Sequence, residues 1–222
     1  MRIGLIGDVH AEDELLGVAL RILTDGGAER LMCVGDLVDG PGSVERCCEL
    51  LAAKNVETVR GNHDRWLITK WTPRADLPDA TLVLGAEAHS FIAALPGEIR
   101  IPVDGGEILL CHGLGGDDMA AVELTAGSAE VRHNAPLARL IEQCAPRSRL
   151  WVLCGHTHRA GVWKHPAITV VNAGTLYREH APCCTLVDLN RGEVIYFAVP
   201  GGARVRRETI SKLGAPARST RW

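Results

Sequence analysis

The chain has 222 residues, of which 46% are hydrophobic and 23% are charged, and this length and composition are typical of one globular domain. Its 24 Lys and Arg residues against 27 Asp and Glu residues give a net charge of −3, which argues against charge-driven binding of nucleic acid. No apolar run approaches the roughly 20 residues that a membrane span needs, and the run Ile3–Ile6 is too short for a secretion signal.

Short apolar runs alternate with amphipathic helical patterns in the first part of the chain. Leu16, Leu20 and Leu23 recur at helical spacing after an acidic turn, and Ser43 has the side chain of an N-cap. In chain order the pattern predicts a strand at 2–7, a helix at 11–25, a strand at 31–35, a helix at 43–54 and a strand at 56–60.

Strands dominate the second part of the chain. The segment 64–104 contains several prolines and yields one predicted helix, at 86–94. The pattern then predicts a strand at 108–111, a helix near 135–145, and strands at 150–154, 168–172, 184–189 and 194–199. Strand–helix–strand units followed by hairpins predict an α/β protein with mixed sheets. We expect one domain over residues 1–200, followed by a basic C-terminal tail or edge strand at 201–222.

The eight cysteines do not form a recognisable zinc or disulfide pattern. The sequence has no C-x-x-C motif, and two pairs of cysteines are adjacent in sequence, a spacing that suits neither a zinc site nor a series of disulfides. Most of the cysteines lie inside apolar runs. We therefore expect buried, reduced thiols and a cytoplasmic protein.

Five predicted strands are each followed by a glycine and by side chains that can bind metal. Five of the nine histidines fall in these segments. The carboxyl ends of parallel strands lie along one edge of a sheet, and glycine lets the backbone turn tightly there. The sequence therefore predicts one metal site, built from Gly7-Asp8-Val9-His10, Gly35-Asp36-Leu37-Val38-Asp39-Gly40, Gly61-Asn62-His63-Asp64, His112-Gly113 and Gly155-His156-Thr157-His158.

These five segments, in this order, resemble the motifs of the calcineurin-like metallophosphoesterases over roughly residues 1–200. The resemblance implies two mixed β-sheets packed as a sandwich and flanked by helices. The run Val171-Asn172-Ala173-Gly174-Thr175 is similar to the Asn-Pro-Gly-Ser stretch of the small bacterial phosphodiesterase branch, with Ala173 in place of proline. Gly40 and His158 depart from the branch of dinucleoside-polyphosphate hydrolases and phosphoprotein phosphatases, which favours the phosphodiesterase branch.

The resemblance also implies two divalent ions. It assigns ligands to them in two sets that share Asp36: Asp8, His10, Asp36 and His158 for one ion, and Asp36, Asn62, His112 and His156 for the other. Carboxylate, imidazole and amide ligands suit Mn²⁺, which we expect, with Fe, Zn²⁺ or Ni²⁺ as alternatives. Such a pair of ions would hold a hydroxide between them for attack on phosphorus.

His63 is not among these ligands. The resemblance implies that it donates a proton to the leaving group, and that Asp39 orients it. Asp64 is the alternative partner of His63, although an acidic side chain at this position also suits the capping of a loop. These residues complete the predicted active site of a phosphodiesterase.

Other functions stay open at this point. A phosphomonoesterase such as a protein phosphatase, or a dinucleoside-polyphosphate hydrolase, would use the same centre. A non-catalytic scaffold would need none of it, and a nuclease is disfavoured by the acidic net charge. We expect a small phosphorylated substrate, with no membrane or nucleic acid as partner, and the oligomeric state is left open.

Some side chains could bind the rest of a substrate. Trp66 and Trp71 follow the His63 motif and could stack on a nucleobase or pack in the core. Four arginines could either hold a second phosphate or lie on the solvated surface: Arg60, Arg65, Arg159 and Arg178.

Overall fold

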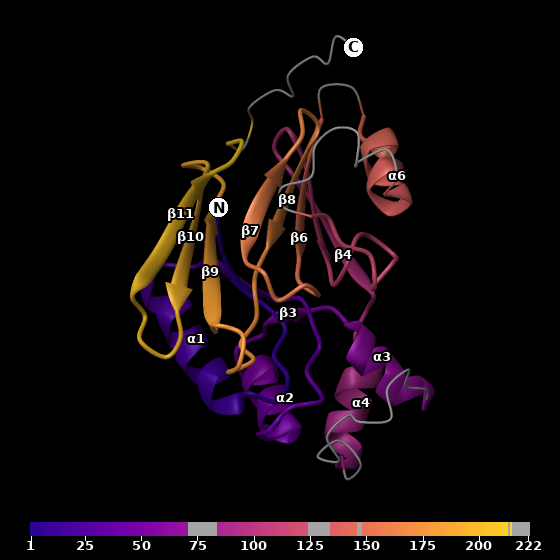
Figure 1. Cartoon of the computed structure of the whole chain (residues 1–222), viewed down its shortest axis with the longest axis vertical. Helices are drawn as coiled ribbons and strands as arrows, with labels where there is room; N and C mark the ends of the chain where they lie inside the picture. The colour runs from indigo at the N-terminus through magenta and orange to yellow at the C-terminus, as the bar shows by residue number, and fades with distance from the viewer. Residues whose placement is uncertain (71–83, 124–133, 146–147, 213, 215–222) are drawn as a thin grey trace.

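Two mixed β-sheets lie face to face in this computed structural model, and helices cover their outer faces (Figure 1). The structure describes residues 1–70, 84–123, 134–145, 148–212 and 214. One sheet has six strands and the other has five. This arrangement confirms the predicted fold class.

The six-stranded sheet combines parallel strands from the start of the chain with antiparallel strands from its end. β1 pairs in parallel with β2, and β2 with β3, whereas β9, β10 and β11 are antiparallel. The order across this sheet is β11 (Arg204–Thr209), β10 (Glu193–Ala198), β9 (Cys183–Asp188), β1 (Arg2–Ile6), β2 (Arg30–Cys33) and β3 (Glu57–Thr58).

The five-stranded sheet has a parallel centre and antiparallel edges. β5 pairs in parallel with β6, and β6 with β8, whereas β4 and β7 are antiparallel to their neighbours. Its order is β4 (Glu98–Val103), β5 (Gly106–Cys111), β6 (Arg149–Cys154), β8 (Ile168–Asn172) and β7 (Gly161–Lys164).

Alternation along the strands divides the core into three apolar layers. Ile3 and Leu5 of β1 face the other sheet and join Trp151 and Tyr196 in the layer between the sheets. Ile6 belongs to the layer beneath the helices of the six-stranded sheet. Those helices are α1 (Asp13–Asp25), α2 (Val44–Ala53) and α4 (Ala86–Ala94), and α6 (Ala135–Gln143) covers the five-stranded sheet (Figure 1).

Several element boundaries differ from the sequence predictions. Helix α1 begins at Asp13 rather than at residue 11, because Ala11 has a left-handed backbone with φ 54°. Helix α3 (Asn62–Thr69) was not predicted and starts inside the His63 motif. The edge strands β4 and β7 were also missed, and β4 contains Pro102, which an edge strand tolerates.

The basic C-terminal segment contributes an edge strand. Arg204–Thr209 forms β11 and pairs with β10, while residues 213 and 215–222 lie outside the described residues. No helix in the described part of the chain is long and apolar enough to cross a membrane.

The cysteines are free thiols, as the sequence suggested. Seven are buried and Cys144 is half-buried. Burial raises the pKa of the Cys111 thiol to about 12 and that of Cys184 to about 12. The thiol form is less reactive than the thiolate, so these side chains act as core residues.

Ser43 caps helix α2, as predicted, because its Oγ accepts a hydrogen bond of 3.1 Å from the Arg46 amide. Replacing Ser43 by alanine should therefore cost about 1 kcal/mol of unfolding free energy, a fall in Tm of roughly 2–4 °C by thermal denaturation. Ser43→Asn is the matched control, since asparagine caps equally well and should keep the parent Tm. Equal melting of all three proteins would contradict the capping role.

Candidate metal centre

The predicted ligands come together where strands of both sheets end. Asp8 follows β1, and Asp36 follows β2. Asn62 starts α3, directly after the turn that follows β3. His112 follows β5, and the pair His156 and His158 follows β6. The six-stranded sheet thus provides the carboxylates and the five-stranded sheet provides three of the imidazoles.

The backbone of this region is unusual. Non-glycine residues rarely adopt φ above zero, and such strain collects at functional sites. Nine described non-glycine residues do so, and five of them belong to the predicted site: His10 (45°), Asp36 (49°), Asp39 (62°), His156 (69°) and His158 (58°). The turns therefore hold these side chains in directions that ordinary loops do not provide.

Two glycines make room for the carboxylates. A Cβ atom at Gly61 would overlap the Asp36 carboxylate, and one at Gly155 would overlap Oδ1 of Asp8. The glycines of these two motifs are thus required by close packing against the two carboxylates.

One cluster consists of Asp8, His10 and His158. Nδ1 of His10 lies 3.1 Å from the carbonyl oxygens of Val38 and Asp39, where it can donate its proton. That leaves a lone pair on Nε2 of His10, which lies 3.1 Å from Nε2 of His158. Oδ2 of Asp8 lies 3.1 Å from the same His158 nitrogen, yet it accepts no hydrogen bond from any described residue. Nε2 of His10, Nε2 of His158 and Oδ2 of Asp8 therefore direct their lone pairs toward the same point. A cation at that point would stabilise this arrangement.

The second cluster surrounds the side-chain oxygen of Asn62. This oxygen lies 2.9 Å from Nε2 of His112 and 2.9 Å from Nδ1 of His156. Oδ2 of Asp36 is 3.2 Å from the same His112 nitrogen. Nδ1 of His112 donates to the carbonyl of Val34 at 2.8 Å, which directs Nε2 toward the cluster.

Asp36 lies between the two clusters. Its carboxylate is within 4.8 Å of ligand atoms of Asp8 and His112, and equally of His10 and His63. Asp36 is also buried, with 2% of its surface exposed. Its carboxylate thus reaches ligands of both clusters, as does that of the neighbouring Asp8, whose Oδ1 lies 3.7 Å from Nδ1 of His112.

The charges of the site also favour cations. Burial raises the pKa of Asp8. For Asp36, burial would raise the pKa, but the charge and hydrogen bond of His112 lower it. His112 itself is buried, and the carboxylates of Asp36 and Asp8 outweigh burial and raise its pKa to about 10. The two carboxylates thus attract positive charge to this buried site, and a divalent ion would supply it.

His63 stands beside the ligands and pairs with Asp39. Its Nδ1 is 2.7 Å from Oδ2 of Asp39. Burial would lower the pKa of His63, but the hydrogen bond to Asp39 and the nearby Asp36 raise it. Asp64 instead accepts hydrogen bonds from the amides of Leu37 and Gly61 at 2.8 and 3.0 Å. The alternative pairing of His63 with Asp64 is therefore absent, and Asp64 caps the loops.

The family comparison supports this geometry. A model described as the calcineurin-like phosphoesterase superfamily domain matches residues 1–192. The chain belongs to the calcineurin-like phosphoesterase superfamily. The curated relative MJ0912, an uncharacterised protein of Methanocaldococcus jannaschii, is 26% identical over 125 residues, which cover 50% of this chain and 48% of the relative. The match thus spans about half the length of that relative.

Solved phosphoesterase structures share the fold over nearly the whole chain. YfcE, a phosphoesterase from E. coli, superposes with a TM-score of 0.59 at 16% identity, covering 95% of this chain and 100% of YfcE. A putative diadenosine tetraphosphatase gives 0.57 at 22%, covering 94% and 93%. An archaeal phosphodiesterase gives 0.52 at 17%, covering 90% and 100%. At these identities the likeness establishes the fold alone.

The calcineurin-like family implies divalent metal ions, and the side chains present fit such ions. The two clusters offer imidazole nitrogen, carboxylate oxygen and amide oxygen, a donor set that suits first-row transition metals. The unsatisfied Oδ2 of Asp8 and the two facing Nε2 atoms of His10 and His158 are explained by a cation between them. The family and the geometry thus agree on the kind of cofactor.

Two of the candidate arginines are already neutralised. Arg65 forms two hydrogen bonds with Asp118, at 2.6 and 2.9 Å, and Arg178 pairs with Glu12 at 2.6 Å. Arg159 is exposed and Arg60 is half-buried.

Trp66 is buried, with its ring 4.6 Å from that of His63, and so belongs to the core. Trp71 lies outside the described residues.

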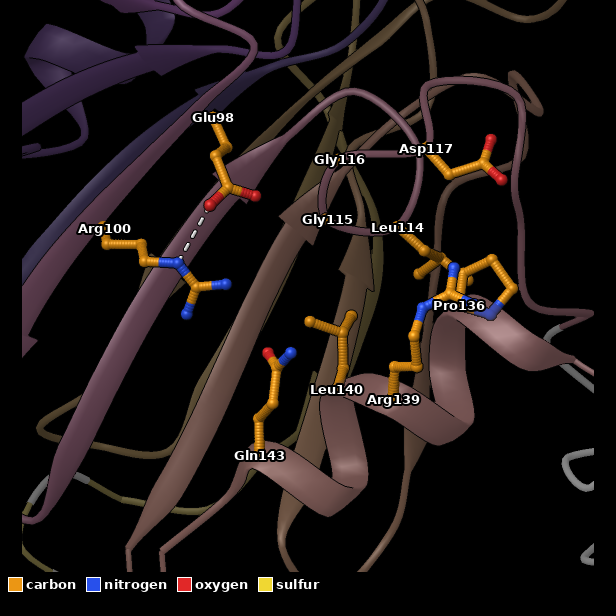
Figure 2. A pocket seen from close by; sticks show the side chains of 10 residues that line it. All are labelled: Glu98, Arg100, Leu114, Gly115, Gly116, Asp117, Pro136, Arg139, Leu140 and Gln143. Atoms are coloured by element: carbon orange, nitrogen blue, oxygen red, sulfur yellow. Dashed lines mark hydrogen bonds and ion pairs between the residues drawn. The ribbon is translucent and has the colours of Figure 1, made fainter.

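A pocket of about 450 Å³ opens between β4, α6 and the loop that follows His112 (Figure 2). Arg100 reaches into it, but Glu98 and Glu107 hold this guanidinium at 2.9 and 2.7 Å. Figure 2 shows Arg139 on the opposite wall, with Asp117 near the rim. The acidic and basic side chains balance, so the pocket is not built as a phosphate clamp.

Sequence reasoning missed several residues that support the centre. Glu12 is one of the residues in the acidic turn before the first predicted helix, which gave no sign of a role in the site. Its side chain is nevertheless fully buried, two positions after His10. Tyr177 and His180 were not singled out, and both contact ligand histidines. The sequence offered one signal for these residues, because His180 is a histidine that closely follows the run Val171–Thr175.

Proposed function

We propose that this protein is a dinuclear metal-dependent phosphoesterase that hydrolyses phosphodiester bonds. The observation that carries the proposal is the pair of ligand clusters that share Asp36, with the His63–Asp39 pair beside them. Asp8, His10, Asp36 and His158 would hold one ion, and Asp36, Asn62, His112 and His156 the other. Two bound divalent ions, Mn²⁺ by preference, would supply positive charge for the phosphate and activate water.

The remaining chemistry belongs to the side chains. His63 would donate its proton to the oxygen of the leaving group, and its hydrogen bond with Asp39 would favour the protonated imidazole. Asp39 accepts from Nδ1 of His63 and so directs Nε2 away from itself, toward the substrate. Gly61 and Gly155 leave the space that both carboxylates occupy.

The substrate class is argued from charge and from the structural neighbours. A net charge of −3 favours a small phosphorylated molecule over nucleic acid. The neighbours include an archaeal phosphodiesterase and a putative diadenosine tetraphosphatase, so hydrolysis of dinucleoside polyphosphates is the second candidate. Buried free thiols fit a reducing compartment such as the cytoplasm.

An assay of metal-reconstituted protein tests this proposal. The protein is depleted of metal, loaded with Mn²⁺, analysed for bound metal, and assayed with bis-p-nitrophenyl phosphate, p-nitrophenyl phosphate and diadenosine tetraphosphate. We expect two ions per chain and a kcat/KM for the diester at least about tenfold above that for the monoester, a margin of roughly 1.4 kcal/mol.

Each of the other possible results of this assay supports a different function or overturns the proposed site. Preference for the monoester would make the protein a phosphomonoesterase, and preference for the dinucleotide would favour the second candidate. Two bound ions without turnover of any substrate would support a scaffold. A single ion, or none, would overturn the dinuclear site itself.

A further inference from the structure

The loop 173–182, between β8 and β9, lies directly against the first ligand cluster. Thr175 Oγ1 and the Leu176 amide both donate to the carbonyl of Asp8, at 2.9 and 2.8 Å. Thr175 also forms a β-bridge with Asp8. This loop is therefore fixed to the same backbone that carries two of the ligands.

A buried acid fastens the middle of the loop. The Glu12 carboxylate is fully buried, and it accepts hydrogen bonds from the Arg178 amide at 2.9 Å and from the Arg178 guanidinium at 2.6 to 3.1 Å. Glu12 lies two positions after the ligand His10. The loop thus has little freedom to move relative to the first cluster.

The end of the loop carries His180 to the ligand His158. The two Nδ1 atoms are 2.7 Å apart, and the ring centroids are separated by 4.9 Å. The ring of Tyr177 lies 5.3 Å from that of His180 and 5.4 Å from that of His10. His180 is exposed on its other side.

The short contact determines where His158 carries its proton. At 2.7 Å one nitrogen must donate and the other must accept. A histidine ligand needs a lone pair on the nitrogen that faces the ion, so when Nε2 of His158 binds, its proton sits on Nδ1. Nδ1 of His180 is then the acceptor of that proton.

We propose that His180 is a positioning residue of the metal centre: it accepts the Nδ1 proton of His158 and thereby fixes the tautomer and ring orientation in which Nε2 binds the first cation. The inference rests on the proposed function, because it deepens the role of the same site. Partners of this kind typically contribute a factor of 10 to 100 to metal affinity. His180 never needs to touch substrate.

Metal binding to the full-length protein tests the role without an activity assay. Metal-depleted parent, His180→Ala and His180→Gln proteins are titrated with Mn²⁺, and free Mn²⁺ is followed by electron paramagnetic resonance. We expect two sites in the parent, a loss of affinity at one of them by about 10- to 100-fold in His180→Ala, and substantial recovery in His180→Gln, whose amide oxygen can accept the same proton. His89→Ala, an exposed histidine of α4, is the matched control and should bind as the parent does.

The position of the proton on the His158 ring gives an independent test of the inference. Long-range proton–nitrogen spectra of the Zn²⁺-loaded parent should show the His158 proton on Nδ1. Unchanged affinity in His180→Ala would overturn the inference alone, and so would equal weakening of both sites that His180→Gln fails to restore. A parent that binds fewer than two ions would instead refute the proposed function, and the inference with it.

Discussion

Replacing Asp36 by asparagine is expected to abolish binding of both cations at concentrations that saturate the parent protein, and to reduce diester turnover by more than about 100-fold, beyond the loss typical of an outer partner. The amide keeps the size of the side chain but removes the charge. Asp36 belongs to both assigned ligand sets: its carboxylate lies close to His10 of the first cluster, and its Oδ2 is 3.2 Å from His112 of the second. Other single-ligand variants should weaken mainly one ion.

Thermal denaturation with and without Mn²⁺ measures this effect. At 100 times the dissociation constant each bound ion adds about 2.7 kcal/mol to the unfolding free energy, so a parent that binds two ions should gain about 5.4 kcal/mol and its Tm should rise by roughly 10–20 °C. The Tm of Asp36→Asn should respond little. Asp25→Asn, at the exposed end of α1, is the control and should behave as the parent. A variant that still bound two ions would rule out Asp36 as the shared ligand.

Replacing His63 by alanine is expected to leave both ions bound and to reduce turnover by about 10²- to 10⁴-fold, the usual contribution of a general acid. The loss should depend on the leaving group. A p-nitrophenolate departs readily without a proton, whereas an alkoxide does not. The loss of kcat/KM should therefore be much larger for a dialkyl or nucleoside diester than for bis-p-nitrophenyl phosphate.

Metal content and substrate comparison separate the roles open to His63. Its ring is also close enough to Asp36 and His10 to serve as a ligand. If His63→Ala lost an ion, the role as proton donor would be wrong and a role as ligand would replace it. Asp39→Asn should show a smaller loss with the same dependence on leaving group, because it weakens the 2.7 Å contact that orients His63 and leaves the imidazole in place.

The sequence was sufficient for the sheet centres because buried parallel strands such as β1 and β6 are continuous apolar runs. It was insufficient at the edges. β7 has only four residues, and Pro102 interrupts the alternating pattern of β4, so neither carries a strong signal. Helix α3 was hidden because its first turn is made of the polar residues of the His63 motif.

In the candidate site, too, the sequence was sufficient for some residues and insufficient for others. The candidate ligands could be named because they follow strands closely in the sequence, and parallel topology brings strand ends together. The supporting contacts could not be predicted from spacing, since Arg178 reaches Glu12 across 166 positions and His180 reaches His158 across 22. The left-handed turns at Asp36 and His158 are likewise a property of the folded backbone.

The origin of the ligands in both sheets has a consequence for the order of events during folding. His10 and His158 are separated by 148 positions in the chain and belong to loops of different sheets. Neither sheet alone can assemble a complete ligand set. A complete set of the proposed ligands therefore exists only after the chain has finished β6 and the two sheets have packed together, which would make binding of the proposed ions a late step of folding.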